Sequence, residues 1–70
     1  MIIIKKEKDS KYYDSSLKRY INLKEILAYY ESGTAIKVID SSNREITEKV
    51  VLQAIIKHKE TNYLKELIKG

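Results

Sequence analysis

The chain lacks cysteine, proline, tryptophan and phenylalanine, and its 70 residues include two glycines and one histidine. Without cysteine there is no disulfide, and a single histidine without thiols does not make a zinc site. The apolar run before Lys5 is too short for a signal peptide or a membrane span. We therefore expect one domain over residues 1–70, located in the cytoplasm, with no metal and no cofactor. Because a domain of this length has a small core, association between chains is the remaining source of support.

Positive charge is concentrated in the first third of the chain. Residues 1–24 contain seven basic and three acidic residues, a net of +4, whereas residues 25–70 are balanced. Lysine and arginine bind a polyanion by releasing condensed counterions, and neighbouring aromatic rings pack on sugar or base. The candidate nucleic-acid contacts are Lys5, Lys6, Lys8, Lys11, Tyr13, Lys18 and Arg19. The alternative interpretation is a solvated lysine-rich edge that prevents sheets from aggregating, and the pattern alone leaves both open.

The first half of the chain predicts three short strands and a helix. Residues 2–5, 11–14 and 19–22 are β-branched or aromatic, with turn chemistry at Asp14 and the two serines after it. Asn22 and Glu25 have the spacing of a capping box. Apolar residues then recur at helical spacing from residue 23 to residue 30, and Gly33 is placed to end the helix in a left-handed conformation.

The second half predicts a hairpin followed by helix. Residues 36–39 are β-branched, a turn begins at Asp40, and residues 44–46 are long enough for a return strand. Thr47 is expected to cap a helix with apolar residues at positions 51, 52, 55 and 56. A short third helix then starts near Thr61 or Asn62, or else one helix runs from residue 48 to residue 69. We favour the break, which gives an α+β fold with the order β-β-β-α-β-β-α-α.

The apolar pattern also predicts which side chains are buried. The expected core is Ile2, Ile4, Tyr12, Tyr20, Leu23, Ile26, Leu27, Tyr30, Ile36, Val38, Ile46, Val51, Leu52, Ile55 and Ile56. A residual apolar stripe on Leu64, Leu67 and Ile68 has too little partner surface within one chain, so we expect it to form a homodimer or higher homo-oligomer interface.

Evidence for catalysis is thin, because no cluster of convergent polar groups stands out. His58 lies in a polar run and is expected to be a solvated residue at a helix end. Asp14 and Asp40 each stand at a turn, where a carboxylate commonly accepts local backbone N–H groups. The sequence therefore predicts a binding protein and not an enzyme.

Residues 11–26 resemble the amino-terminal DNA-binding domain of polyhydroxyalkanoate synthesis regulators. The shared features are a basic residue before Tyr-Tyr-Asp, a serine turn, and Tyr-Ile-Asn-Leu leading into an acidic-capped helix. Similarity continues through Gly33, residues 36–40, residues 45–47 and residues 52–56. It also includes the segment 61–68, which reads Thr-Asn-Tyr-Leu-Lys-Glu-Leu-Ile.

The resemblance implies a cytoplasmic, repressor-like transcriptional regulator that binds double-stranded DNA without a catalytic step. This chain has Ser10-Lys11 where the family has two arginines, and lysine reads a guanine edge less well than arginine. The family's carboxy-terminal region, implicated in polymer association, has no counterpart within residues 1–70, so polymer binding is not carried over. The alternative function is a small protein-interaction module that uses an exposed strand edge or the last helix.

Overall fold

The structure is a computed structural model that describes residues 1–8 and 11–60, with the side chains of residues 59 and 60 left aside. It contains four strands and two α-helices, which confirms the α+β class. The elements are β1 (Ile2–Lys6), β2 (Tyr12–Asp14), β3 (Arg19–Ile21), α1 (Leu23–Glu31), β4 (Ile36–Ile39), α2 (Thr47–Ile55) and a π-helical turn, η2 (Ile56–Glu60). The predicted third helix and its stripe of Leu64, Leu67 and Ile68 lie outside the described residues.

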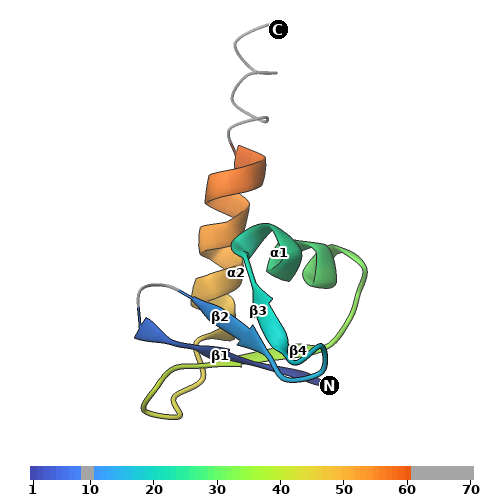
Figure 1. The fold of residues 1–70 in the computed structure, drawn as a ribbon. Coiled ribbons are helices and arrows are strands. Elements are labelled where there is room, and N and C mark those ends of the chain that lie inside the picture. Colours follow the sequence, from blue (N-terminus) through green and yellow to red (C-terminus); the bar gives the residue numbers. More distant parts are fainter. Residues whose placement is uncertain (9–10, 61–70) are drawn as a thin grey trace, which may run out of the picture.

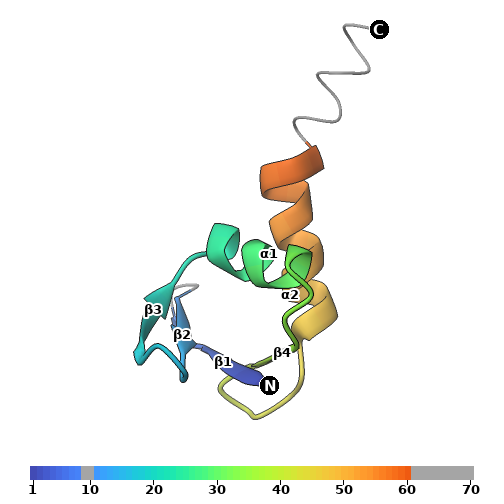
Figure 2. The same ribbon diagram turned by 90° about the vertical axis from the view of Figure 1, so that its right-hand side faces the viewer.

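The four strands form one sheet in the order β3-β2-β1-β4. Strand β1 pairs antiparallel with β2 and parallel with β4, with Ile4 opposite Asp14 on one side and Val38 on the other. Both helices lie on the same side of this sheet (Figures 1 and 2). One face of the sheet is therefore covered by helices, and we call the other the open face.

The prediction of a return strand at residues 44–46, which would complete a second hairpin, is wrong. Residues 44–46 contribute one isolated bridge, between Ile39 and Glu45, and β4 takes its main pairing from β1. The Thr47 hydroxyl accepts the backbone N–H of Val38 at 2.9 Å, where a continuing strand would offer a carbonyl. The chain turns into α2 at this residue, so no ladder can extend further.

The start of α1 follows the sequence prediction, whereas the start of α2 does not. Asn22 and Glu25 form a full capping box, in which each side chain accepts the other's backbone N–H. The residue that precedes α2 is Ile46, and it makes no side-chain capping bond. Thr47 does not cap α2, because its hydroxyl is already bonded to Val38 and Glu45. Gly33 has φ +79°, as expected for a glycine that ends a helix.

The core lies between the sheet and the two helices. Its buried apolar residues are Ile4, Tyr12, Ile21, Ile26, Leu27, Val38, Val50, Val51 and Ala54, with Ile2, Leu23, Tyr29, Ile36, Ile46 and Ile55 packed around it.

Four predicted core residues are exposed instead: Tyr20, Tyr30, Leu52 and Ile56. In α2 the buried residues are Val50, Val51 and Ala54, so the apolar stripe is displaced by one residue, or about 100° around the helix. In β3 the alternation of side chains places Ile21, and not Tyr20, under the helices.

Candidate nucleic-acid interface

The open face carries a row of side chains that crosses three strands. Lys5 of β1 is paired with Tyr13 of β2, and Tyr13 is paired with Tyr20 of β3. Neighbours along each strand point to the opposite face, because side chains alternate in an extended chain. Ile4, Tyr12 and Ile21 are accordingly buried beneath the helices, and the row is left on the side that neither described helix covers.

The two tyrosines of this row contact each other and a lysine. The rings of Tyr13 and Tyr20 meet edge to face with centroids 5.3 Å apart. The Lys11 Nζ lies 5.9 Å from the centroid of the Tyr20 ring, within the range of a cation–π contact. Aromatic faces and ammonium groups are thus held side by side, an arrangement that suits a ligand with planar rings and negative charge.

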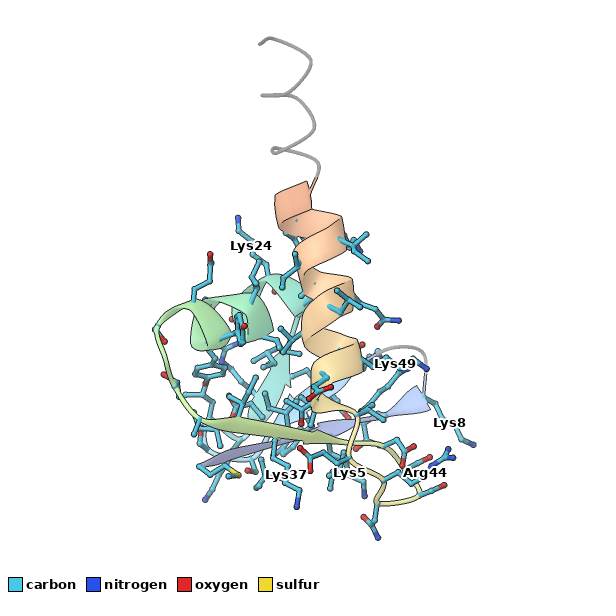
Figure 3. The ribbon with its side chains drawn as sticks, turned by 180° about the vertical axis from the view of Figure 1, so that it is seen from behind. Lys5, Lys8, Lys24, Lys37, Arg44 and Lys49 are labelled. Atoms are coloured by element: carbon cyan, nitrogen blue, oxygen red, sulfur yellow. The ribbon has the colours of Figure 1, made fainter. Side chains whose placement is uncertain are left out.

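Strand β4 adds Lys37 to the open face, a residue that the charge pattern did not single out. Lys37 is paired with Ile3, on the same face of β1 as Lys5. Figure 3 shows Lys5 and Lys37 on the side of the sheet away from the helices. The alternation of side chains in β4 could have placed Lys37 on the face opposite the buried Val38. The charge argument missed this residue because it lies in residues 25–70, whose net charge is zero.

The other predicted contacts are dispersed around the sheet. Lys6 has the opposite orientation from Lys5 and lines a cavity on the helix-covered side. Lys8 is exposed just after β1, at the end of the strand in Figure 3. Lys18 is exposed in the β2–β3 turn, where it has φ 57°. The predicted set therefore comprises an open-face group and residues at its margins.

Arg19 is engaged in holding β3 to the start of α1. Its Nη2 donates to Glu25 Oε1 at 2.9 Å, and the other carboxylate oxygen accepts the Asn22 N–H at 3.0 Å. These hydrogen bonds lower the pKa of Glu25, and the bond from the Asn22 backbone N–H has the largest effect. The guanidinium thus stabilises the capping box and has less freedom to meet a ligand than the lysines have.

The turn between β2 and β3 is fixed by Asp14, which is fully buried. One carboxylate oxygen accepts the backbone N–H groups of Ser16 and Leu17 and the Ser16 hydroxyl, and the other accepts the Tyr29 hydroxyl of α1. Burial raises the pKa of Asp14, but the hydrogen bonds led by Tyr29 outweigh it, so the pKa lies below its usual value. The predicted turn role of Asp14 is confirmed, with a bond to α1 that the sequence did not reveal.

Asp40 also has its predicted turn role. Its Oδ1 accepts the N–H groups of Ser42 and Arg44, and its Oδ2 accepts the Arg44 Nε at 3.0 Å. These bonds, chiefly the backbone bond from Arg44, lower the pKa of Asp40. His58 lies at the helix end as expected, but it is half-buried and lines the same cavity as Lys6.

Neither described helix is strongly basic, so neither resembles a recognition helix. The basic residue of α1 is Lys24 and that of α2 is Lys49, and each helix also carries glutamate. Within residues 1–8 and 11–60, no helix is both long and apolar enough to cross a membrane. The same part of the chain contains no group of three His, Cys, Asp or Glu residues placed to hold a metal.

The sequence profile of the PHB/PHA accumulation regulator DNA-binding domain matches residues 3–62 of the chain. The chain belongs to this family. The match contains strand β1 from its second residue, the other three strands, both α-helices and every predicted nucleic-acid contact. Comparisons with curated proteins and with solved structures gave no match.

Membership in the PHB/PHA accumulation regulator family supports a DNA-binding regulatory role. The family is one of DNA-binding domains and not of enzymes. The open face of the sheet is a surface of this PHB/PHA regulator domain on which lysine side chains lie beside aromatic rings.

Proposed function

We propose that this domain binds double-stranded DNA through the open face of its sheet and acts as a transcriptional repressor. Lys5, Lys11 and Lys37 contact phosphates, while Tyr13 and Tyr20 pack against sugar or base. The observation that carries the proposal is the row from Lys5 through Tyr13 to Tyr20, which crosses three adjacent strands on the uncovered side. Other DNA-binding proteins place strands of a sheet in a groove of the duplex.

The margins of the open face extend the footprint. Lys8 and Lys18 are exposed at opposite ends of the strands, where each can reach a neighbouring phosphate. Lys6 and Arg19 complete the predicted set from the helix-covered side. Lysine holds a phosphate as a point charge and reads base edges less specifically than arginine does. Affinity from this surface is therefore largely electrostatic, with sequence discrimination left to the tyrosines and to the shape of the DNA.

A repressor of this kind acts in the cytoplasm by occupying a promoter, without a catalytic step. We propose that it does so as a homodimer or higher homo-oligomer joined through Leu64, Leu67 and Ile68. Two copies related by a twofold axis bind two half-sites about one helical turn apart. A mass of one chain, measured by light scattering at micromolar concentration, would remove the oligomer from this proposal.

The direct test is fluorescence anisotropy of a labelled duplex from the protein's own promoter, beside a scrambled duplex of equal length. If about four phosphates are neutralised, the logarithm of the affinity falls with the logarithm of the salt concentration at a slope of about −3.6. Lys5→Gln should weaken binding and reduce that slope by about 0.9. Lys49→Gln removes the same charge from α2 and is the matched control.

A salt-independent affinity, or an equal loss in Lys5→Gln and Lys49→Gln, would contradict binding through the open face. The alternative function, a protein-interaction module, is favoured by the exposed apolar side chains of Tyr30, Leu52 and Ile56. Neutralising Lys5, Lys6 and Lys11 together abolishes DNA binding under the first hypothesis and leaves protein binding nearly unchanged under the second. The triple variant therefore separates the two functions.

A further inference from the structure

A cavity of about 670 Å³ opens on the helix-covered side of the molecule. It lies where the end of β1, the start of β2, the end of β3, the start of α1 and the end of α2 with η2 come together. Lysines and a histidine line it together with aromatic, apolar and amide side chains: Lys6, Lys11, Lys24, Lys57 and His58, then Tyr12, Tyr20, Ile21, Leu23, Asn22 and Gln53. Its volume lies within the range of pockets that bind small organic ligands.

The charges around this cavity are all of one sign. Its lining includes four lysines and, among the residues that the structure describes, no aspartate or glutamate. The ion pairs of Arg19 with Glu25 and of Arg44 with Asp40 involve none of these lysines. Four ammonium groups around one concave site repel one another and focus a positive potential into it. A bound polyanion would relieve that repulsion.

The interior of the cavity suits a planar organic body as well as charge. Ile21 and Leu23 supply apolar surface, and Tyr20 supplies a half-exposed ring beside the Lys11 ammonium. Gln53 adds an amide with both a donor and an acceptor, and Asn22 adds its amide NH2 donor, because its Oδ1 already accepts the Glu25 N–H in the capping box. In such a site the lysines can bind phosphates, while the apolar and aromatic surface and the amides can bind a heterocyclic base of the same molecule.

The cavity lies at the edge of the surface proposed for DNA: it shares Lys6, Lys11 and Tyr20 with that surface and extends beyond it to Lys24 and Lys57. Figure 3 shows Lys24 on the helix side of the molecule and Lys37 on the opposite side of the sheet. A duplex lying on the open face therefore does not reach Lys24. Lys11 and Tyr20 are shared, because both line the cavity and Tyr20 also packs against Tyr13 of the open face.

We propose that this cavity binds a nucleotide with two or more phosphate groups, and that its occupation lowers the affinity for DNA through Lys11. The phosphates lie among the four lysines, and the base lies against Tyr20, Ile21 and Leu23 within reach of the two amides. A phosphate that takes the Lys11 ammonium withdraws one cation from the open face. Linkage makes the effect reciprocal, so DNA weakens nucleotide binding by the same factor. The antagonism rests on the proposed function, whereas nucleotide binding itself does not.

The first experiment is isothermal titration of the whole chain, without DNA, with ADP, inorganic pyrophosphate and adenosine in turn. Because both parts of the ligand contribute, ADP should bind at least tenfold more tightly than pyrophosphate or adenosine. Lys57→Gln should weaken ADP binding about tenfold, since a charge-assisted contact is lost in a concave site. Lys49→Gln is the matched control, because it removes the same charge from α2, outside the cavity, and it should leave ADP binding unchanged.

Two outcomes would overturn nucleotide binding. Pyrophosphate binding as tightly as ADP would leave an anion site without base recognition, and an equal loss in Lys57→Gln and Lys49→Gln would indicate general electrostatic attraction. Circular dichroism of each variant establishes that it is folded.

The anisotropy assay then separates this inference from the proposed function. Saturating ADP should reduce the affinity for the promoter duplex severalfold in the unmodified chain and not in Lys57→Gln. If Lys57→Gln weakens DNA binding as much as Lys5→Gln does, the whole cavity is part of the DNA surface and the proposal that the two ligands compete through Lys11 is wrong. If ADP binds and DNA does not, the cavity stands and the DNA proposal fails.

Discussion

The two faces of the sheet are built from neighbouring residues with opposite properties. Ile4, Tyr12 and Val38 are buried under the helices. Their neighbours in the sequence, Lys5, Tyr13 and Lys37 respectively, lie on the open face. The covered face supplies the free energy of folding, and the open face contributes little apolar burial. Stability and the proposed DNA affinity are therefore carried largely by opposite faces of the sheet, and single substitutions at Asp14 or at Tyr13 should change one without the other.

The largest effect is expected on the covered face at Asp14. Asp14→Ala leaves the Ser16 and Leu17 N–H groups and the Tyr29 hydroxyl without their acceptor. We predict a loss of about 3 kcal/mol in the free energy of unfolding, measured by urea denaturation, because the variant loses four hydrogen bonds to one charged and buried carboxylate. Asp40→Ala at the other turn is the control. It should cost less than Asp14→Ala does, since the hydrogen bonds of Asp40 are exposed and its paired Arg44 side chain is 78% exposed.

The next effect comes from the bond between the covered face and α1. Tyr29→Phe removes the hydroxyl that donates to Asp14 and should lower the free energy of unfolding by about 1.5 kcal/mol. Tyr30→Phe, one residue away, is the matched control, and because Tyr30 is 56% exposed its change should be near zero. Equal effects of the two substitutions would contradict the role given to the Asp14–Tyr29 pair.

On the open face, Tyr13→Leu keeps apolar bulk and removes the aromatic ring. We predict that the affinity for the promoter duplex falls about fivefold, equivalent to about 1 kcal/mol, through loss of packing on sugar or base. The unfolding midpoint in urea should change little, because the residue faces away from the helices. The same substitution at Tyr30 should leave the affinity unchanged. A Tyr13→Leu variant that loses stability but keeps its affinity for DNA would contradict the assignment of Tyr13 to DNA binding and not to folding.

The smallest predicted effect is the acid dependence of the covered face. Because the pKa of Asp14 is lower in the folded chain than in the unfolded one, its charge stabilises the fold above the unfolded pKa. That contribution is lost as the pH falls through the folded value. The stability of the unmodified chain and of Asp14→Asn should therefore converge as the pH is lowered. Glu25 and Asp40 also have lowered pKa values, so both proteins still lose stability in acid. A constant difference between the two denaturation curves would refute the assignment to Asp14.

Local signals in the sequence were sufficient where one short segment determines its own structure. The capping box at Asn22 and Glu25, the left-handed Gly33 and the two aspartate turns all have the predicted form. The lysine and tyrosine pattern predicted that several of these residues share one face. Lys5 and Tyr13 are paired on the open face, whereas Lys6 and Arg19 lie on the other side of the sheet.

The two Asp-Ser-Ser turns show where such signals end. Asp14 and Asp40 each accept the N–H of the second serine after it, yet the first turn joins two paired strands and the second leads to a single bridge. The difference lies in partners that are distant in the sequence. Tyr29 of α1 donates a hydrogen bond to Asp14, whereas the backbone of β4 is hydrogen-bonded to β1 and, at Val38, to the Thr47 hydroxyl. Which side of α2 is buried, and whether Lys37 lies on the open face, also depend on such long-range contacts, which a single sequence does not reveal.

The central position of β1 in the sheet has a consequence for how the chain folds. Ile2 is paired with Ile36, so one flank of β1 must stay unpaired until β4 has been made. Strands β2 and β3 and helix α1 are contiguous and close only short loops, whereas the β1–β4 pairing closes a long one and is entropically slower. During synthesis on the ribosome, the isoleucine-rich β1 therefore exposes a bare edge, and docking of β4 is the step that ends its tendency to pair with other chains.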